Sequence, residues 1–248
     1  MEKYKVLKTQ LLELGLNNMA NNFLQEANRC REANLDYLDY LSEIVSKEII
    51  EKLERSINYR IRNAKYPMFK TIEQFDFSFQ PDLDKQKVLD IVEFDFLKGA
   101  ENILFIGPPG VGKSHLSIAI GIEACKRRIR NVFYTATELL KQLKIAKVSN
   151  SLPDFLERLR RFSIVIVDEL GYMPLDIEDA HLFFQFVNSK YEKTSVILSS
   201  NSNFAEWDKI FKDSVVASAI IDRLVHHSRI FKINGNSYRV KNKLVDSE

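Results

Sequence analysis

The sequence lacks the long apolar runs of membrane proteins. None of its apolar segments reaches the roughly 18 residues that a membrane-spanning helix needs. The N-terminal sequence MEKYKVLKTQLLELGL has charged residues within its apolar stretches, unlike the continuous apolar core of a signal peptide. These absences exclude a membrane bundle and predict that the protein has no membrane partner.

Cysteine is scarce as well. The chain has Cys30 and Cys125, whose spacing fits neither a disulfide framework nor a zinc site. We therefore expect a reducing, cytoplasmic location. The histidines also lack ligand spacing with cysteine, and we expect structural or surface roles for them. They are His115, His181, His226 and His227.

The charge is balanced in total but unevenly distributed. The 248 residues are 45% apolar and 28% charged, which is ordinary for a globular protein and excludes a disordered chain. The net charge is +2, yet residues 56–70, 126–147 and 223–243 are basic, whereas residues 168–179 carry carboxylates and no base. Such basic patches can bind a polyanion, although solvated helix faces explain them equally well.

Helical spacing of apolar residues predicts a small all-α N-terminal domain over residues 1–65. We expect it to contact DNA, a partner protein or other subunits. Its basic C-terminal end supplies three DNA-binding candidates, Arg60, Arg62 and Lys65. The aromatic, proline-bounded residues 66–81 are predicted to be a linker to a second domain, residues 82–248.

The second domain alternates short apolar runs with helical patterns, beginning with a helix over residues 82–97. We expect strands at 102–106, 131–134, 163–167, 195–199 and 229–233. Two amphipathic helices are expected between the second and third strands. This order predicts an α/β fold with a parallel five-stranded sheet that helices cover on both faces.

The segment GPPGVGKS fits the phosphate-binding pattern G-x-x-x-x-G-K-[ST] and lies between a predicted strand and a predicted helix. Glycines let successive backbone N–H groups point at phosphate oxygens, and the helix adds its positive N-terminus. Lys113 would reach the β- and γ-phosphates, and the Ser114 hydroxyl would hold Mg²⁺. We predict a nucleotide site made of Gly107, Pro108, Pro109, Gly110, Val111, Gly112, Lys113, Ser114 and His115.

Asp168 and Glu169 follow the apolar run IVIV, at the carboxyl end of a predicted central strand. Ligands of open α/β sheets bind at that edge. Asp168 can hold Mg²⁺, and Glu169 is placed to deprotonate an attacking water. Any strand can end in Asp-Glu, but this position on the next core strand after the loop favours hydrolysis of the nucleotide.

Other polar residues are candidates for the same chemistry. Asn201 ends the fourth strand and would position the water, unless it only starts a turn. Arg223 would stabilise the transferred phosphoryl group in cis or in trans, unless it only pairs with its neighbouring carboxylate. Arg239 is a second cationic candidate, with Arg229 and Lys232 as nearby rivals.

Lys141, Lys144 and Lys147 lie three residues apart on one of the two amphipathic helices, so they lean toward one face. That face could follow a phosphate backbone, which makes these lysines further DNA-binding candidates. A solvated surface explains the same spacing.

The motifs together resemble the AAA+ ATPases of the IstB type, ATP-binding helper proteins that bacterial insertion sequences encode beside a transposase. The resemblance rests on GPPGVGKSHL, VIVDELGYMPL, SSNSNFAEWDKIF, DRLVHHS and GNSYR, and on LLELGLNNMANNF and AKYPMFKTIEQFDFSF nearer the N-terminus. It covers about residues 5–243. Helicase loaders of the DnaC and DnaI type are similar in the ATPase core and differ mainly in the N-terminal domain.

This resemblance implies an ATP and Mg²⁺ site with Lys113 and Ser114 as the Walker A pair and Asp168 and Glu169 as Walker B. It implies three further roles: sensor one for Asn201, a trans-acting arginine finger for Arg223 and sensor two for Arg239. Ser114 replaces the threonine of many relatives and keeps the hydroxyl. Little sequence follows Arg239, so a reduced C-terminal lid is expected.

The implied activity is ATP-dependent assembly as a homo-oligomer on double-stranded DNA, with composite ATP sites between subunits. The assembly would recruit or stimulate the cognate transposase, and hydrolysis would reset it. A DnaC/DnaI-type helicase loader is the first alternative. A non-hydrolysing nucleotide switch that acts as a scaffold is the second.

Overall fold

The structure is a computed structural model that describes residues 2–172 and 175–238. The chain divides into two compact units, one ending at Tyr59 and one beginning at Arg60. No helix of the described residues is long and apolar enough to cross a membrane.

The N-terminal unit is helical. It consists of α1 (Glu2–Glu13), α2 (Asn17–Glu32) and most of α3 (Tyr37–Asn63). Its buried apolar core is small and contains Leu11, Ala20, Phe23 and Ile44. With so little apolar area buried, polar contacts have a larger share in holding these helices together.

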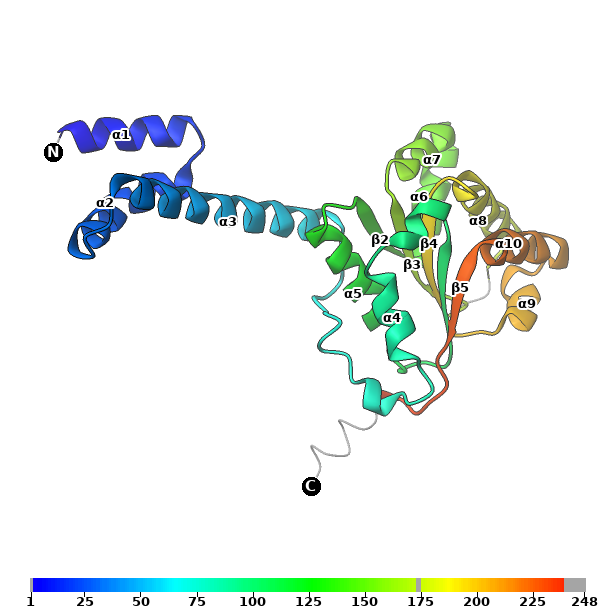
Figure 1. The fold of residues 1–248 in the computed structure, drawn as a ribbon. Coiled ribbons are helices and arrows are strands. Elements are labelled where there is room, and N and C mark those ends of the chain that lie inside the picture. Colours follow the sequence, from blue (N-terminus) through cyan, green and yellow to red (C-terminus); the bar gives the residue numbers. More distant parts are fainter. Residues whose placement is uncertain (1, 173–174, 239–248) are drawn as a thin grey trace, which may run out of the picture. The chain divides into compact units, whose positions relative to one another are not determined.

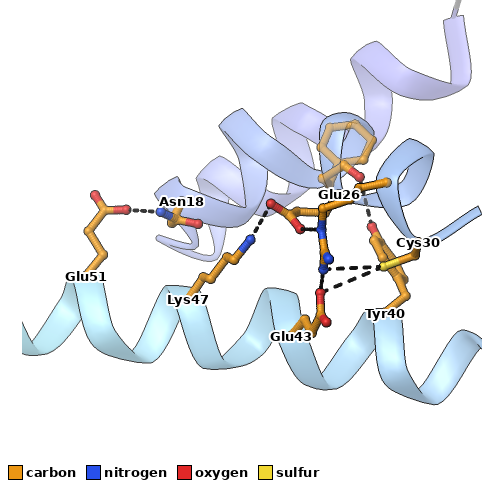
Figure 2. A network of polar contacts seen from close by, with 9 residues as sticks. Asn18, Glu26, Cys30, Tyr40, Glu43, Lys47 and Glu51 are labelled. Atoms are coloured by element: carbon orange, nitrogen blue, oxygen red, sulfur yellow. Dashed lines mark hydrogen bonds and ion pairs between the residues drawn. The ribbon is translucent and has the colours of Figure 1, made fainter. Parts of the chain in front are cut away.

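A polar network joins α2 to α3 (Figure 2). Glu26, which is buried on α2, accepts hydrogen bonds from Lys47 of α3 and Arg29 of α2. Arg29 also pairs with Glu43 of α3. The hydrogen bonds from Lys47 and then Arg29 hold the pKa of the Glu26 carboxyl below its usual value. A buried carboxylate is costly without such partners, so the network specifies how α2 and α3 pair.

The second unit is built on an all-parallel five-stranded sheet with the order β2-β3-β4-β1-β5, which confirms the predicted fold class (Figure 1). The strands are β1 (Asn102–Ile106), β2 (Asn131–Thr135), β3 (Ile164–Leu170), β4 (Ser195–Ser200) and β5 (Ser228–Lys232). The helices are α4 (Lys85–Ile91), α5 (Lys113–Lys126), α6 (Ala136–Val148), α7 (Leu152–Arg160), α8 (Ile177–Lys190), α9 (Trp207–Phe211) and α10 (Ser214–His226). Short 3₁₀ helices lie at Phe77–Phe79, Asp95–Gly99 and Phe204–Glu206.

The expectation of one continuous helix over residues 82–97 is wrong. Helix α4 ends at Ile91, and a separate 3₁₀ helix, Asp95–Gly99, follows. Phe94 between them has φ 60°, a left-handed conformation that an α-helix cannot contain. The buried side chains of Val88 and Phe96 explain why the apolar pattern continues across the break.

The sheet has an apolar core on each face. Val165 and Val167 of β3 belong to one core, which includes residues of α6, α8 and α10, whereas Ile164 and Ile166 belong to the other, which includes residues of α4 and α5. Alternate residues of a strand point to opposite faces. Burial on both faces therefore explains why the strand sequence is continuously apolar.

Candidate nucleotide site

The segment predicted to bind phosphate lies between β1 and the start of α5. Gly110 and Gly112 have φ angles of 84° and 100°, in the left-handed region that favours glycine. A Cβ atom at Gly112 would lie 2.5 Å from the ring of Phe75. Both the backbone conformation and the close ring therefore require glycine at position 112.

Lys113 is the first residue of α5 and is buried. Its Nζ donates hydrogen bonds to the carbonyl oxygens of Gly107, at 2.7 Å, and Pro108, at 2.8 Å. The ammonium group is thus held against the loop, at the positive N-terminus of a helix. Both features favour an anion at this place.

Two hydroxyl groups converge on the Asp168 carboxylate at the end of β3. Ser114 Oγ lies 3.0 Å from Asp168 Oδ1 and donates to it, and Ser199 Oγ of β4 donates to the same oxygen. Asp168 is only 4% exposed. Adjacent ligands of an octahedral Mg²⁺ ion lie about 3 Å apart, since each metal–oxygen bond is about 2.1 Å long. The Ser114 and Asp168 oxygens therefore fit Mg²⁺ in spacing and in donor type.

Glu169 differs from the adjacent Asp168 in backbone conformation and in exposure. Its φ is 64°, and its side chain is exposed. Its backbone N–H donates to Ser199 Oγ at 3.1 Å, so one serine contacts both acidic residues. Asn201, just after β4, lies beside this turn, since its Oδ1 would be 2.9 Å from a Cβ atom at Gly171. The structure thus brings Asn201 to the segment that follows Glu169.

A cavity of about 420 Å³ lies against the loop. One wall consists of residues 110–115, which include His115. The other wall was not predicted, because residues 66–81 were interpreted as a linker. The residues of that wall are Met68, Lys70, Gln74, Phe75, Asp76, Phe79, Gln80 and Tyr238. In the sequence, the closely spaced aromatic residues of FDFSF could have indicated that this segment forms a wall of a cavity.

Several contacts fix this cavity wall. The Tyr238 N–H donates to the carbonyl oxygen of Gly110 at 3.0 Å, and the Tyr238 ring packs edge-on against Phe79. A nitrogen of His115 lies 2.8 Å from the carbonyl oxygen of Thr71. Burial lowers the pKa of His115 below its usual value, which favours the neutral ring. Apolar walls beside a phosphate loop suit a nucleoside.

Residues 9–246 match the model of the family described as IstB-like ATP binding protein. The chain belongs to this family. It is 40% identical over 238 residues to an ATP-binding protein of insertion sequence IS232 from Bacillus thuringiensis subsp. berliner, covering 96% of this chain and 95% of that protein. The predicted family membership is thus confirmed.

Two solved structures share the fold of the second unit. The DnaC helicase loader has a TM-score of 0.53 and 21% identity, covering 70% of this chain and 98% of that one. DnaA from Aquifex aeolicus, bound to AMPPCP, has a TM-score of 0.56 and 22% identity, covering 71% of this chain. This chain spans about half of that longer protein, at 55%. The likenesses confirm the predicted AAA+ fold.

The cationic candidates of this IstB-like chain lie in different places. Arg223 does not line the loop cavity; its Nε donates to Asn188 at 3.0 Å, and its guanidinium lies 4.8 Å from the ring centre of Phe184. Arg239 lies outside the described residues. Arg229 and Lys232 line a separate cavity beside α4, and Arg229 pairs with Glu101 at 2.8 Å. In the described part of the chain, neither rival reaches the loop cavity.

The DNA-binding candidates of the IstB-like chain on α6 differ in their partners. Lys144 pairs with Asp176 and Asp179 near the start of α8, at 3.1 and 2.8 Å, and Lys147 pairs with Glu178 at 2.6 Å. Lys141 makes no ion pair with any described residue and lines a cavity of about 350 Å³ together with Glu169. The three lysines therefore do not form one unpaired basic face.

The remaining three candidates lie near the end of α3. Arg62 is exposed, and Lys65 Nζ lies 5.7 Å from the ring centre of Tyr134. Arg60 Nε is buried and has no hydrogen-bond partner among the described residues. Arg62 and Lys65 are both exposed and therefore accessible to a phosphate backbone.

Proposed function

We propose that this chain binds ATP with Mg²⁺ in the loop cavity and hydrolyses it to ADP and phosphate. The proposal depends on one observation: Ser114, which follows Lys113 at the start of α5, donates a hydrogen bond to Asp168 at the carboxyl edge of the sheet, where ligands of such folds bind. Membership of a family of ATP-binding proteins supports it. The aromatic wall around Phe75 and Phe79 would hold the nucleoside.

In the proposed reaction, Lys113 stabilises the β- and γ-phosphates. Ser114 and Asp168 hold Mg²⁺, which would neutralise charge on the phosphate oxygens. Glu169 accepts a proton from a water whose oxygen bonds to the γ-phosphorus, while the bond to the β–γ bridging oxygen breaks and ADP leaves. Asn201 orients this water, and Arg223 of a neighbouring subunit stabilises the transition state. Arg239 is kept as the proposed second sensor.

We propose further that ATP drives assembly of a homo-oligomer on double-stranded DNA, which recruits or stimulates the cognate transposase. The insertion-sequence origin of the 40% identical relative supports this role. Lys141, Arg62 and Lys65 are the preferred DNA contacts, because each is exposed and has no ion pair among the described residues. Lys144 and Lys147 would contact DNA only after leaving their carboxylate partners.

A helicase loader is the second candidate function, because the DnaC loader matches over 98% of its length. The two functions differ in the nucleic acid that they bind. Fluorescence anisotropy with matched double- and single-stranded DNA, with ATP, ADP or no nucleotide, separates them. ATP-dependent preference for the duplex supports the transposition role, whereas preference for the single strand supports the loader. Binding of neither contradicts both.

Glu169→Gln tests the ATPase assignment. Loss of the base should lower ATP turnover by a factor on the order of 100 or more, since general base catalysis contributes at least that much. ATP binding should persist, because the phosphate ligands remain. Glu54→Gln, at an exposed position on α3, is the matched control and should leave turnover unchanged. Unchanged turnover in Glu169→Gln would contradict the assignment, and no turnover in the wild type would favour the non-hydrolysing switch.

A further inference from the structure

A glutamate and two adjacent histidines that are distant from it in the sequence meet where α8 and α10 end. They are Glu192, which follows α8, His226, which ends α10, and His227. One ligand atom from each residue lies within 4.8 Å of the others. His227 Nε2 and Glu192 Oε1 are 3.6 Å apart, and the centres of the two imidazole rings are 4.1 Å apart. All three side chains are exposed, so solvent and ions reach them.

Two imidazoles and one carboxylate form a donor set that proteins use for Zn²⁺. Metal–ligand bonds of about 2.0–2.2 Å with tetrahedral angles put two ligand atoms about 3.4 Å apart. The distance of 3.6 Å between His227 Nε2 and Glu192 Oε1 is close to that value. Small rotations of exposed side chains can therefore complete the geometry.

Neighbouring groups already orient these residues. The Tyr191 hydroxyl lies 2.8 Å from His226 Nδ1, and the two rings are stacked. Where Nδ1–H donates to the tyrosine oxygen, Nε2 keeps its lone pair for a metal; such outer hydrogen bonds typically fix metal-ligating histidines. The carbonyl oxygen of His227 accepts a hydrogen bond from the N–H of Asn102 in β1 at 2.7 Å, which fixes the backbone.

The surrounding charge is compatible with a cation. The C-terminal ends of α8 and α10 carry partial negative charge, which favours a positive ion. Two basic residues are near in sequence: Lys193 follows Glu192, and Arg223 lies one helical turn before His226. Its guanidinium is engaged with Asn188 Oδ1 and the Ala219 carbonyl oxygen, at 3.0 and 3.1 Å.

We propose that Glu192, His226 and His227 bind one divalent transition-metal ion, of which Zn²⁺ fits the donors best, with a remaining position open to water. None of the three residues lines the loop cavity, so this ion is separate from the proposed Mg²⁺. The site adjoins Tyr191, whose ring lies 6.0 Å from the Arg223 guanidinium. A bound metal would therefore rigidify the surface that presents Arg223.

The test is calorimetric titration of ZnCl₂ into the full chain after treatment with a chelator, without nucleotide. We expect one equivalent of Zn²⁺ to bind the wild type. His226→Ala and His227→Ala should each weaken binding by roughly ten-fold or more, since even outer-shell partners contribute that much. His181→Ala removes an exposed histidine of α8 outside the cluster and should bind like the wild type.

Co²⁺ provides a spectroscopic readout of the ligand set and its geometry. The wild type with one equivalent of Co²⁺ should show the visible absorption of a tetrahedral nitrogen- and oxygen-ligated ion, and Glu192→Gln should change it. Circular dichroism checks that each variant folds, which we expect because all replaced side chains are exposed. Absent Zn²⁺ binding, or equal binding by the wild type and the His226→Ala/His227→Ala variant, would overturn the proposal.

Discussion

The hydroxyl of Ser199 connects the two acidic residues that end β3. It donates to Asp168 Oδ1 and accepts the backbone N–H of Glu169. Ser199 was not a candidate in the sequence, because serines in strands are common and its partners lie 30 and 31 residues away. We therefore propose that Ser199 is a positioning residue, which orients Asp168 for the proposed Mg²⁺ and fixes the backbone at Glu169.

Ser199→Ala should lower the apparent affinity for Mg²⁺ and the rate of ATP turnover, each by roughly 10- to 100-fold, as expected for an outer-shell partner of a metal ligand. ATP binding without Mg²⁺ should change little. Turnover measured against Mg²⁺ concentration separates the two effects. Ser195→Ala is the matched control, since its buried hydroxyl on the same strand has no hydrogen-bond partner among the described residues. Equal behaviour of the two variants would contradict this role.

Lys190 is a second buried group with a measurable consequence. It is 1% exposed and donates to the carbonyl oxygen of Leu159. Burial, and then the charge of Arg160, lowers its pKa to about 7. An unfolded lysine titrates near pH 10.4, so between about pH 7 and 10 the unfolded chain binds more protons. This group therefore makes the protein more stable as the pH rises through that range.

Lys190→Met should remove this dependence. The melting temperature of the variant should exceed that of the wild type at pH 7. The difference between the two melting temperatures should become smaller toward pH 10. The Leu159 carbonyl oxygen keeps a hydrogen bond from the Phe162 N–H at 3.2 Å, so the substitution does not leave this acceptor without a hydrogen bond. Thermal unfolding across this pH range provides the measurement, with the exposed Lys193→Met as control. A lower melting temperature at every pH would show that the ammonium is stabilising.

At the scale of elements, ion pairs link Lys144 and Lys147 of α6 to carboxylates at the start of α8, which leaves Lys141 as the preferred lysine for the proposed DNA contact. Lys144 and Lys147 hold the start of α8, next to the segment that follows Glu169. DNA that displaced the carboxylates would therefore act on elements adjoining the ATP site. Lys141 lines a cavity together with Glu169 and has no ion pair among the described residues to break before it contacts DNA.

Lys141→Ala should weaken duplex binding at every sequence tested and lower the slope of log affinity against log salt by about 1, as loss of one phosphate contact does. Lys144→Ala should change that slope less, because its charge is already neutralised by Asp176 and Asp179. Fluorescence anisotropy over a series of salt concentrations, with a non-hydrolysable ATP analogue, measures both variants. A larger effect of Lys144→Ala would mean that DNA does replace these ion pairs.

The sequence predicted the sheet because its strands are continuous apolar runs, and it predicted a glycine-rich turn between the first strand and the next helix because glycine spacing is local. It did not predict contacts between distant segments. The basic face of α6 and the acidic stretch at Asp176 were both visible, but their pairing depends on how α8 packs. The contact of Phe75 with the loop and the position of Glu192 beside His226 also depend on how distant segments pack.

At the scale of the whole molecule, the proposed ATP site of one chain lacks, among the described residues, an arginine that could stabilise the transferred phosphoryl group. Lys113 and Ser114 line the loop cavity and Asp168 accepts a hydrogen bond from Ser114, whereas Arg223 lies against Phe184 and does not line that cavity. An arginine can act in trans on the transferred phosphoryl group, so this separation is compatible with a site completed by a neighbouring subunit. One experiment can therefore test both the proposed oligomer and the proposed role of Arg223 as an arginine finger.

Mixing two inactive variants tests whether Arg223 acts in trans. Glu169→Gln and Arg223→Ala should each lack turnover alone, but an equal mixture forms some sites with an intact glutamate facing an intact arginine. Random subunit exchange should restore about a quarter of the wild-type rate, because each residue is intact in half of the positions. The control mixes Glu169→Gln with the double variant Glu169→Gln/Arg223→Ala, which contains no intact glutamate and should stay inactive. If native mass spectrometry shows mixed oligomers and turnover is still absent, Arg223 does not act across the interface.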